Sequence, residues 1–480
     1  MDQDTDPKTG CFRALLPTFR RNKRTSRPVA PPAYIPDDVL QSQACPLDGP
    51  ADFAYALESS WWRDDKPPPY HNAPARSPAF VHTVNDTLAS LDGELRGISL
   101  QIHSHPELAW KEHYAHDVLT AFMAKHGFQV TKHYLGLDTA WRAEFFHSNE
   151  ENAHHTTGRV LGINAEMDAL PLGHACGHNL IAMSGVGVAV AVKAALEAHR
   201  VAGKIVILGT PAEEGGGGKV LLLERGGYEE MDTCIMSHPM PGPPHIANLG
   251  STTARYGFQV DFEGHSAHAA ASPWEGTNAL DAAFMAYSGV SVLRQQMKPT
   301  YRVHGIVVGR DEWTPNVIPD HATMRWYVRA PTKDEAAALS EKVKNCFRGA
   351  ALSTGCKLTI NEDIPYYDLQ NDETLSDVFT DIAQKYYGIP VGRTSTSAST
   401  DFGNVSQTLP CIHPSYSIPT EQGNHTPEFA KAAATPAAHK AAMQITKALA
   451  VFGVKFLQDD VLAAKVRHNF LRGQESGVAA

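Results

Sequence analysis

Three potential metal ligands fall within one short motif of the sequence, His174-Ala-Cys-Gly-His178. Gly177 permits a tight turn that can aim Cys176 and His178 at one point. A thiolate and an imidazole are ligands that suit zinc. Cysteine and histidine also occur in protein cores as small or hydrogen-bonded side chains. The motif by itself is therefore equally consistent with a metal site and with core packing.

Two adjacent carboxylates, Glu213 and Glu214, follow the apolar run Ile205-Val-Ile-Leu208 and precede four glycines. This position is the expected carboxyl end of a strand, where ligands gather in open α/β sheets. One carboxylate could coordinate a metal while the other takes a proton from a metal-activated water. Alternatively, both could stabilise the positive end of the next helix. The metal interpretation becomes stronger when other polar residues converge on the same edge.

Strand-like and helix-like segments alternate between residues 159 and 236 and indicate βαβ units. We expect strands at 159–166, 204–209 and 232–236, with helices near 180–198 and 217–225. This order predicts an α/β fold with a mostly parallel sheet and helices on both faces. Asp168 and His238 follow the first and third of these strands, so they should meet Glu213, Glu214 and the Cys176 motif. Such a cluster predicts hydrolysis of an amide or peptide bond.

The order of elements changes between residues 251 and 365 to strand, helix, strand, strand, helix, strand. This is the ferredoxin-like βαββαβ arrangement. The expected segments are 254–262, 277–296, 303–309, 321–329, 333–352 and 356–361. Apolar and polar residues alternate along 321–329, with Ala322, Met324, Trp326 and Val328 as apolar positions, which supports a strand there. Thr332 begins a capping box, which supports the helix expected at 333–352.

The βαββαβ segment is therefore predicted to be a small domain inserted into a larger one. Helix-like stretches near 373–388 and 427–456 and an apolar run at 409–412 return the chain to the larger domain. The predicted division is a two-part catalytic domain, an inserted lid or dimerisation domain and two terminal extensions. Their boundaries are 81–250 with 366–460, then 251–365, then 1–80 and 461–480.

The first 80 residues contain 13 of the 32 prolines and show no sustained periodicity. This composition predicts a disordered extension. Its basic run from Arg20 to Arg27 could be a docking signal, but a solvated tail is the favoured interpretation.

The overall composition is that of an ordinary globular protein, with 42% hydrophobic and 20% charged residues. The net charge of -10 opposes binding to nucleic acid or to an anionic membrane surface, so we expect neither partner. An odd number of cysteines, seven, and the lack of an apolar signal segment predict a cytoplasmic protein. The apolar stretch 180–192 is too short to span a bilayer and predicts a buried helix.

A series of motifs between residues 84 and 456 resembles peptidase family M20, the two-metal aminoacylase and carboxypeptidase family. The motifs, in the family's order, are His105-Pro-Glu-Leu108 with Glu112, Met167-Asp-Ala-Leu-Pro171, His174-Ala-Cys-Gly-His178, Pro211-Ala-Glu-Glu214, Ser237-His-Pro239, Gly264-His-Ser-Ala-His268, Asn316-Val-Ile-Pro319 and Asn424-His-Thr-Pro-Glu428. The cysteine-containing motif resembles the branch that cleaves N-acyl amino acid conjugates. The unbroken Glu-Glu-Gly-Gly-Gly-Gly-Lys run resembles dipeptidases acting on β-alanyl-lysine or Xaa-Arg type substrates.

The resemblance implies a role for each matching residue. It implies a centre of two divalent metal ions, with zinc expected and manganese or cobalt as alternatives. The implied metal ligands are Cys176, His178, Glu214, His238 and His425; Glu213 is the implied general base, and Asp168 the carboxylate that orients a ligand. A lone histidine before Thr-Pro is usually a loop residue, so His425 is implied by the resemblance alone.

The resemblance also implies roles for the inserted domain. That domain would lie over the site and form a homodimer, in which His268 reaches the substrate carbonyl of the neighbouring subunit. Asn316 and Arg329 would position the substrate's carbonyl and carboxylate. The alternatives are a surface turn for His268 and an outward ion pair for Arg329.

Two residues depart from the pattern of the amidohydrolase branch. Asn179 and Glu166 stand where that branch commonly has aspartate, so the surroundings and the metal preference of the site are open. The leading hypothesis is a metal-dependent hydrolase of a dipeptide or N-acyl amino acid. The alternatives are a biosynthetic or detoxifying amidohydrolase for one conjugate, and a non-catalytic metal-binding scaffold, which would have no use for the base Glu213.

Overall fold

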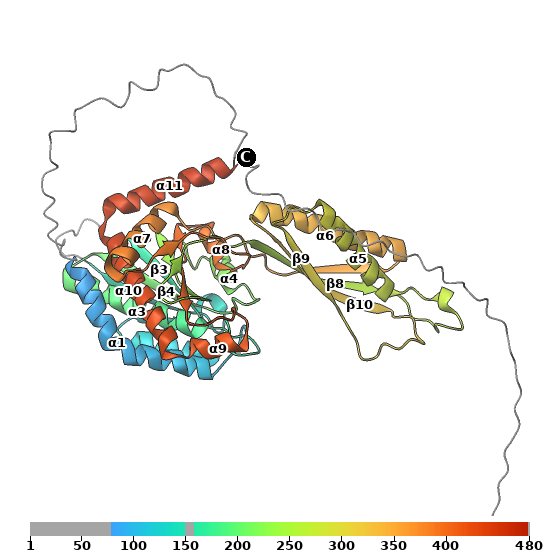
Figure 1. Cartoon of the computed structure of the whole chain (residues 1–480), viewed down its shortest axis with the longest axis horizontal. Coiled ribbons are helices and arrows are strands. Elements are labelled where there is room, and N and C mark those ends of the chain that lie inside the picture. The colour runs from blue at the N-terminus through green and yellow to red at the C-terminus, as the bar shows by residue number, and fades with distance from the viewer. Residues whose placement is uncertain (1–77, 149–157, 479–480) are drawn as a thin grey trace, which may run out of the picture. The chain divides into compact units, whose positions relative to one another are not determined.

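The computed structural model describes residues 78–148 and 158–478 (Figure 1). Its largest sheet has six strands in the order β1-β2-β4-β3-β5-β13. These strands are β1 (Gln129–Lys132), β2 (Trp141–His147), β3 (Val160–Glu166), β4 (Gly203–Thr210), β5 (Thr233–Ile235) and β13 (Cys411–Ile412). Four of them run parallel, while β1 and β2 add an antiparallel edge. The predicted mostly parallel sheet is confirmed, although β1 and β2 were not foreseen.

Helices cover both faces of this sheet because apolar side chains on strand β4 alternate between two cores. Ile205 and Ile207 belong to one core, which they share with α1, α3, α7 and α10. Val206 and Leu208 belong to the other, which includes Leu222 of α4. The helices of this main sheet unit are α1 (Ala79–Ser104), α2 (His113–Lys125), α3 (His178–His199), α4 (Gly218–Glu224), α7 (Glu373–Tyr387), α8 (Phe402–Ser406), α9 (Pro427–Ala433), α10 (Pro436–Gln458) and α11 (Asp460–Val478), with the short 3₁₀ turn η2 (Tyr134–Gly136).

Helix α3 confirms the predicted buried helix. Among the described residues it is the one helix long and apolar enough to cross a membrane, but 89% of its most apolar window is buried inside the protein. Burial of this kind is what the core helix of a doubly covered sheet requires. The helix begins with His178, at the carboxyl edge of the sheet.

Residues 254–362, which we call the βαββαβ unit, have their own sheet and their own core. The elements are β8 (Ala254–Glu263), α5 (Ala279–Leu293), β9 (Arg302–Val308), β10 (His321–Ala330), α6 (Lys333–Thr354) and β11 (Lys357–Glu362), with short 3₁₀ turns η4 (Pro273–Glu275) and η5 (Arg294–Gln296). The strand order is β11-β8-β10-β9, all antiparallel, and α5 and α6 pack on one face (Figure 1). The predicted order of elements is therefore confirmed.

Local details of the βαββαβ unit also agree with the sequence. Ala322, Met324, Trp326 and Val328 of β10 are buried against the helices. The Thr332 hydroxyl accepts a hydrogen bond from the Glu335 backbone N–H at 3.2 Å and caps α6. Alternation and capping thus position both elements as expected.

A third, small sheet was not predicted. It has the order β12-β7-β14-β6, with β6 (His238–Pro241), β7 (Ala247–Asn248), β12 (Val391–Gly392) and β14 (Ser415–Ile418). These strands are two to four residues long and therefore show no readable periodicity. Strand β6 is important for the site because His238 is its first residue.

Both ends of the chain were predicted to be terminal extensions, and the structure describes only part of them. The predicted disordered extension, 1–80, lies outside the described residues except for 78–80. The segment expected to be a C-terminal tail, 461–480, forms most of helix α11, because Leu462 and Val466 are buried in the main core. The domain boundaries stay a prediction.

Candidate metal centre

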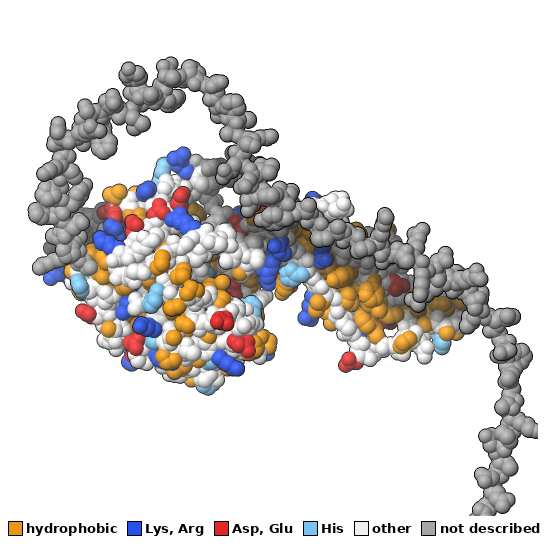
Figure 2. Space-filling model, in the orientation of Figure 1, with side chains coloured by type: hydrophobic (Ala, Val, Ile, Leu, Met, Phe, Trp, Pro, Cys, Tyr) orange, Lys and Arg blue, Asp and Glu red, His pale blue; other side chains and the backbone are white. Residues whose placement is uncertain are grey.

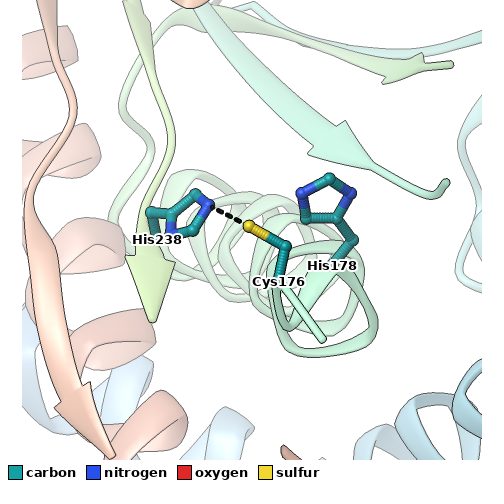
Figure 3. A group of neighbouring side chains, drawn as sticks. All are labelled: Cys176, His178 and His238. Atoms are coloured by element: carbon teal, nitrogen blue, oxygen red, sulfur yellow. Dashed lines mark hydrogen bonds between the residues drawn. The ribbon is translucent and has the colours of Figure 1, made fainter. Parts of the chain in front are cut away.

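Gly177 forms the turn that brings Cys176 and His178 together. It adopts a left-handed conformation (φ 80°) as the N-cap of α3, so Cys176 precedes the helix and His178 begins it. The Sγ atom of Cys176 lies 3.4 Å from Nε2 of His238, at the start of β6 (Figure 3). The rings of His178 and His238 are perpendicular, with centroids 6.0 Å apart. The sequence motif and the strand-end histidine therefore meet as predicted.

Glu214 and His425 complete the cluster from two further segments. Glu214 follows strand β4, and its Oε2 lies 3.4 Å from Nε2 of His425. Its Oε1 lies 3.9 Å from Nε2 of His178. His425 has a positive φ of 67°, an unusual conformation for a histidine, and is held by a backbone hydrogen bond to Ala175. The five side chains that the family resemblance implied as ligands are thus neighbours.

The donor atoms in this cluster fit divalent cations. Three overlapping groups have ligand atoms within 4.8 Å of one another: Cys176, His178 and His238; Cys176, Glu214 and His425; His178, Glu213 and Glu214. Nε2 of His178 and Oε1 of Glu214 are buried without a hydrogen-bond partner, so a cation would satisfy both. Burial, followed by the nearby Glu214 charge, raises the pKa of the Cys176 thiol, and a bound cation would favour the thiolate instead.

Asp168 contacts both His178 and Glu214, two of the implied metal ligands. Its Oδ1 lies 3.2 Å from Nδ1 of His178, and its Oδ2 accepts a hydrogen bond from the Glu214 backbone N–H at 3.0 Å. A carboxylate on Nδ1 directs Nε2 of the imidazole toward a metal. The geometry therefore fits the orienting role expected for Asp168.

Glu213 is buried beside the cluster but makes no close ion pair there. Its nearest described basic contact is Nε2 of His178, 4.0 Å from Oε2. Burial, then the charges of Glu166 and Glu214, raises the pKa of Glu213 well above its ordinary value. The Glu213 backbone carbonyl accepts a 2.6 Å hydrogen bond from the Tyr366 hydroxyl, which itself accepts one from Gly217 N–H. Tyr366 thus fixes the loop, a contact that no local signal predicts.

A cavity of about 240 Å³ opens beside these residues. Its walls include Cys176, Glu213, Glu214, His238 and His425 together with Arg329 from β10. The Arg329 guanidinium donates a 2.7 Å hydrogen bond to the Ser399 hydroxyl and makes no salt bridge with any described carboxylate. A guanidinium at the wall that has no carboxylate partner can receive a substrate carboxylate.

Two predicted substrate residues lie elsewhere. His268 and Asn316 are exposed in neighbouring loops of the βαββαβ unit. The Asn316 carbonyl accepts a hydrogen bond from Ala269 N–H, and His268 Nδ1 accepts from Ala270 N–H. Neither residue lines the cavity of its own chain. The predicted reach of His268 into a neighbouring subunit stays a prediction.

The two departures from the family pattern have different surroundings. The Asn179 amide donates to the Ser99 hydroxyl at 2.9 Å and to the Ala433 carbonyl, so it faces the core. Glu166, in contrast, faces the cluster: its Oε2 lies 3.4 Å from Nε2 of His178. His174 of the sequence motif is buried and joins none of the ligand groups.

Sequence reasoning missed two charged residues next to Glu166. The buried Lys219 ammonium lies 2.7 Å from Glu166 Oε1 and 2.6 Å from Asp401 Oδ1. Burial opposes ionisation of Glu166, but the Lys219 and His178 charges outweigh it and lower the pKa of Glu166. Lys219 ends the Glu-Glu-Gly-Gly-Gly-Gly-Lys run, but lysine is usually a surface residue and Asp401 is 182 residues away, so nothing in the run indicated their pairing. Two signals could have pointed to it: the glutamate at position 166 and the lysine that ends the Glu-Glu-Gly-Gly-Gly-Gly-Lys run.

Comparison with known proteins agrees with this geometry. The sequence model of Peptidase family M20/M25/M40 matches residues 162–449. The chain is 42% identical over 388 residues to the Xaa-Arg dipeptidase of Mus musculus, and 41% identical over 392 residues to that of Homo sapiens. Each of these alignments covers 78% of this chain and 88% of the relative.

Solved structures share the fold at low sequence identity. A dinuclear metal-binding peptidase of the M20 family from Bacillus subtilis aligns with a TM-score of 0.55 and 20% identity, over 76% of this chain and 98% of its own. The aminobenzoyl-glutamate utilization protein of Klebsiella pneumoniae aligns with a TM-score of 0.61 and 18% identity, over 78% and 99%. Since the family match spans more than half of the sequence, the chain belongs to peptidase family M20/M25/M40 and is a hydrolase.

Proposed function

We propose that the protein hydrolyses dipeptides with a basic C-terminal residue, Xaa-Arg or Xaa-Lys, with N-acyl amino acids as the alternative substrates. The observation that supports this proposal most directly is that the Glu213 carboxylate, whose nearest described basic atom is 4.0 Å away, shares one cavity with the proposed metal ligands and the Arg329 guanidinium. The similarity to two Xaa-Arg dipeptidases supports the choice of substrate.

Each side chain has a distinct task in this reaction. When bound, divalent metal ions polarise the amide carbonyl and make water more acidic. Glu213 accepts the proton of the attacking water and passes it to the leaving nitrogen. Asp168 holds the orientation of His178 through their 3.2 Å contact. Arg329 pairs with the substrate carboxylate and sets the position of the scissile bond.

We propose two zinc ions for the centre, held by Cys176, His178, Glu214, His238 and His425. The thiolate and the three imidazoles favour zinc over magnesium or calcium, which prefer oxygen ligands. Manganese and cobalt also accept imidazole and carboxylate ligands and are the alternatives.

We also propose a homodimer formed through the βαββαβ unit. Large apolar side chains of α5 are exposed, with Phe284 57% and Val292 75% accessible, and Ile306 of edge strand β9 is 60% accessible. Figure 2 shows hydrophobic side chains on the visible face of this unit. An apolar helix face beside an unpaired strand edge favours association with a second copy. In such a dimer, His268 and Asn316 would be available to the partner's substrate.

The cellular setting of the reaction is also a proposal. We propose a cytosolic protein on the basis of the seven scattered cysteines, and one without nucleic-acid or anionic membrane partners on the basis of the net charge of -10.

A hydrolysis panel with metal analysis of the same sample tests the proposed function. Xaa-Arg, Xaa-Lys, β-alanyl and N-acyl amino acid substrates are incubated with the purified protein, and products are quantified by mass spectrometry. We expect the largest kcat/KM for a basic C-terminal residue, and loss of activity after chelation. Turnover confined to one acyl conjugate would favour the biosynthetic or detoxifying alternative, and no turnover with full metal content would favour the scaffold.

A further inference from the structure

A fully buried lysine lies beneath the metal centre. Lys219 is the second residue of α4, and neither it nor its partners Glu166 and Asp401 is accessible to solvent. Its ammonium lies 2.7 Å from Glu166 and 2.6 Å from Asp401, and its backbone N–H donates to the second Asp401 oxygen at 2.9 Å. Burying an ammonium is costly, so such an ion is retained only where it is matched closely.

The carboxylates around Lys219 have the arrangement of a cation site. Oxygens of Glu166, Glu213 and Asp401 lie within 4.8 Å of one another, and all three residues are buried. Three oxygens at this spacing could bind a divalent ion such as manganese. The Lys219 ammonium already supplies the positive charge for two of them. It forms no ion pair with Glu213 among the described contacts.

This acidic group adjoins the proposed metal ligands. Glu166 reaches the cluster through Oε2, which lies 3.4 Å from His178 Nε2 and has no hydrogen-bond partner. Glu213 adjoins it through its 4.0 Å contact with the same nitrogen. An additional metal ion held by Glu166, Glu213 and Asp401 would occupy the lone pairs that Glu213 needs to accept a proton.

We propose that Lys219 acts as a built-in cation that excludes an additional metal ion from Glu166, Glu213 and Asp401 and so keeps Glu213 uncoordinated. Lys219 is in this sense a positioning residue, since it acts through carboxylates and does not touch the substrate. Exclusion of the additional ion depends only on Lys219, Glu166, Glu213 and Asp401. The expected effect of that exclusion on catalysis rests on the proposed function.

The test counts metal ions in Lys219→Met. Wild-type protein and variant are dialysed against excess Mn²⁺, freed of unbound ion, and analysed by plasma mass spectrometry. We expect one more Mn²⁺ per chain in the variant, and a kcat lower by roughly 10²-fold or more with a smaller change in KM. Adding Glu166→Gln removes a ligand and should abolish the additional uptake.

Lys344→Met is the matched control. Lys344 is also buried and bridges two carboxylates, Glu341 and Glu362, but lies in the βαββαβ unit. The same chemical change there should leave the Mn²⁺ ratio and kcat at wild-type values.

Folding of the variant is itself informative. Because Mn²⁺ would replace the ammonium, the Tm of Lys219→Met should rise with Mn²⁺ by more than that of the wild type. A folded Lys219→Met with the wild-type Mn²⁺ ratio would overturn the proposal, and so would failure to fold at every Mn²⁺ concentration. The ion count needs no substrate, so an inactive wild type would refute the proposed function and leave this inference standing.

Discussion

The main sheet unit and the βαββαβ unit each contain a lysine bridging two carboxylates, but in opposite surroundings. In the main unit, Lys219, Glu166 and Asp401 are completely buried. In the βαββαβ unit, the Lys344 side chain is 8% exposed, while its partners Glu341 and Glu362 are 55% and 48% exposed. Solvent screens the second set and not the first.

This difference separates a unit whose buried charges surround the proposed metal centre from one whose core is almost entirely apolar. Among the described residues of the βαββαβ unit, the buried polar side chains are Arg255, Ser340 and Lys344. The main unit gathers many more at the carboxyl edge of its sheet, including Asp168, which bridges two proposed ligands. Buried ionic groups stabilise a fold poorly, so their concentration at this edge is better explained by the reaction than by folding.

The largest expected effect is on catalysis. Glu213→Gln keeps the shape of the side chain but removes the base, so kcat should fall by roughly 10² to 10⁴-fold while metal content stays at the wild-type level. Steady-state kinetics with the best substrate of the panel, together with metal analysis, measure both quantities.

Glu362→Gln provides the corresponding change in the βαββαβ unit and should leave kcat unaltered. Equal activity in Glu213→Gln and wild type would refute the proposed mechanism. An equal loss of kcat in Glu213→Gln and Glu362→Gln would show that the two units do not differ in their importance for catalysis.

The second effect is on stability in the metal-free protein. With a chelator present, Lys219→Met leaves the buried Asp401 without its cation and Glu166 with His178 alone, and should lower the free energy of unfolding by about 3–5 kcal/mol. Lys344→Met leaves carboxylates that water can solvate, and should cost about 1 kcal/mol or less. Urea denaturation measures both values, and similar costs for the two variants would show that burial does not distinguish the clusters.

Regular elements of both units could be predicted from sequence because their signals are local. Alternation along β10 and the Thr332 cap defined adjacent elements of the βαββαβ unit. The rule that ligands gather at strand carboxyl ends was enough to predict that Asp168, Glu213 and His238 lie together. His425 came from the family resemblance, since its loop carries no pattern of its own.

The missed features depend on long-range contacts. Lys219 and Asp401 are 182 residues apart, and their pairing exists only in the folded chain. The small sheet is built from strands too short to show alternation, and helix α11 is fixed by docking Leu462 and Val466 on the main core. Tertiary packing, which sequence periodicity does not encode, decided these elements.

The third effect is a dependence of stability on pH in the main unit. His116 of α2 is buried, its Nε2 has no partner, and burial lowers its pKa from 6.5 to about 4. Between these values the unfolded chain binds a proton that the folded chain does not, so stability falls as pH falls. From pH 7 to pH 5 this contribution should amount to a loss of about 2 kcal/mol.

His116→Leu removes that titration, so denaturation midpoints at pH 7 and pH 5 should differ less than in wild type. The exposed His113 on the same helix offers the control His113→Gln, which should keep the wild-type difference. No described histidine of the βαββαβ unit is buried, so none there should contribute in this way. An unchanged pH dependence in His116→Leu would show that another group is responsible.

The smallest effect compares one glycine from each unit. Gly177 has φ 80°, and a Cβ there would lie 2.5 Å from Pro239 Cγ, so Gly177→Ala should cost about 1–2 kcal/mol. Gly349 is an exposed glycine within α6 with nothing near a Cβ, so Gly349→Ala should raise stability by about 0.5–1 kcal/mol. Because Gly177 aims Cys176 and His178, its variant should also bind Zn²⁺ more weakly, whereas Gly349→Ala should not. Unaltered Zn²⁺ affinity in a folded Gly177→Ala would mean that the turn is not what positions these ligands.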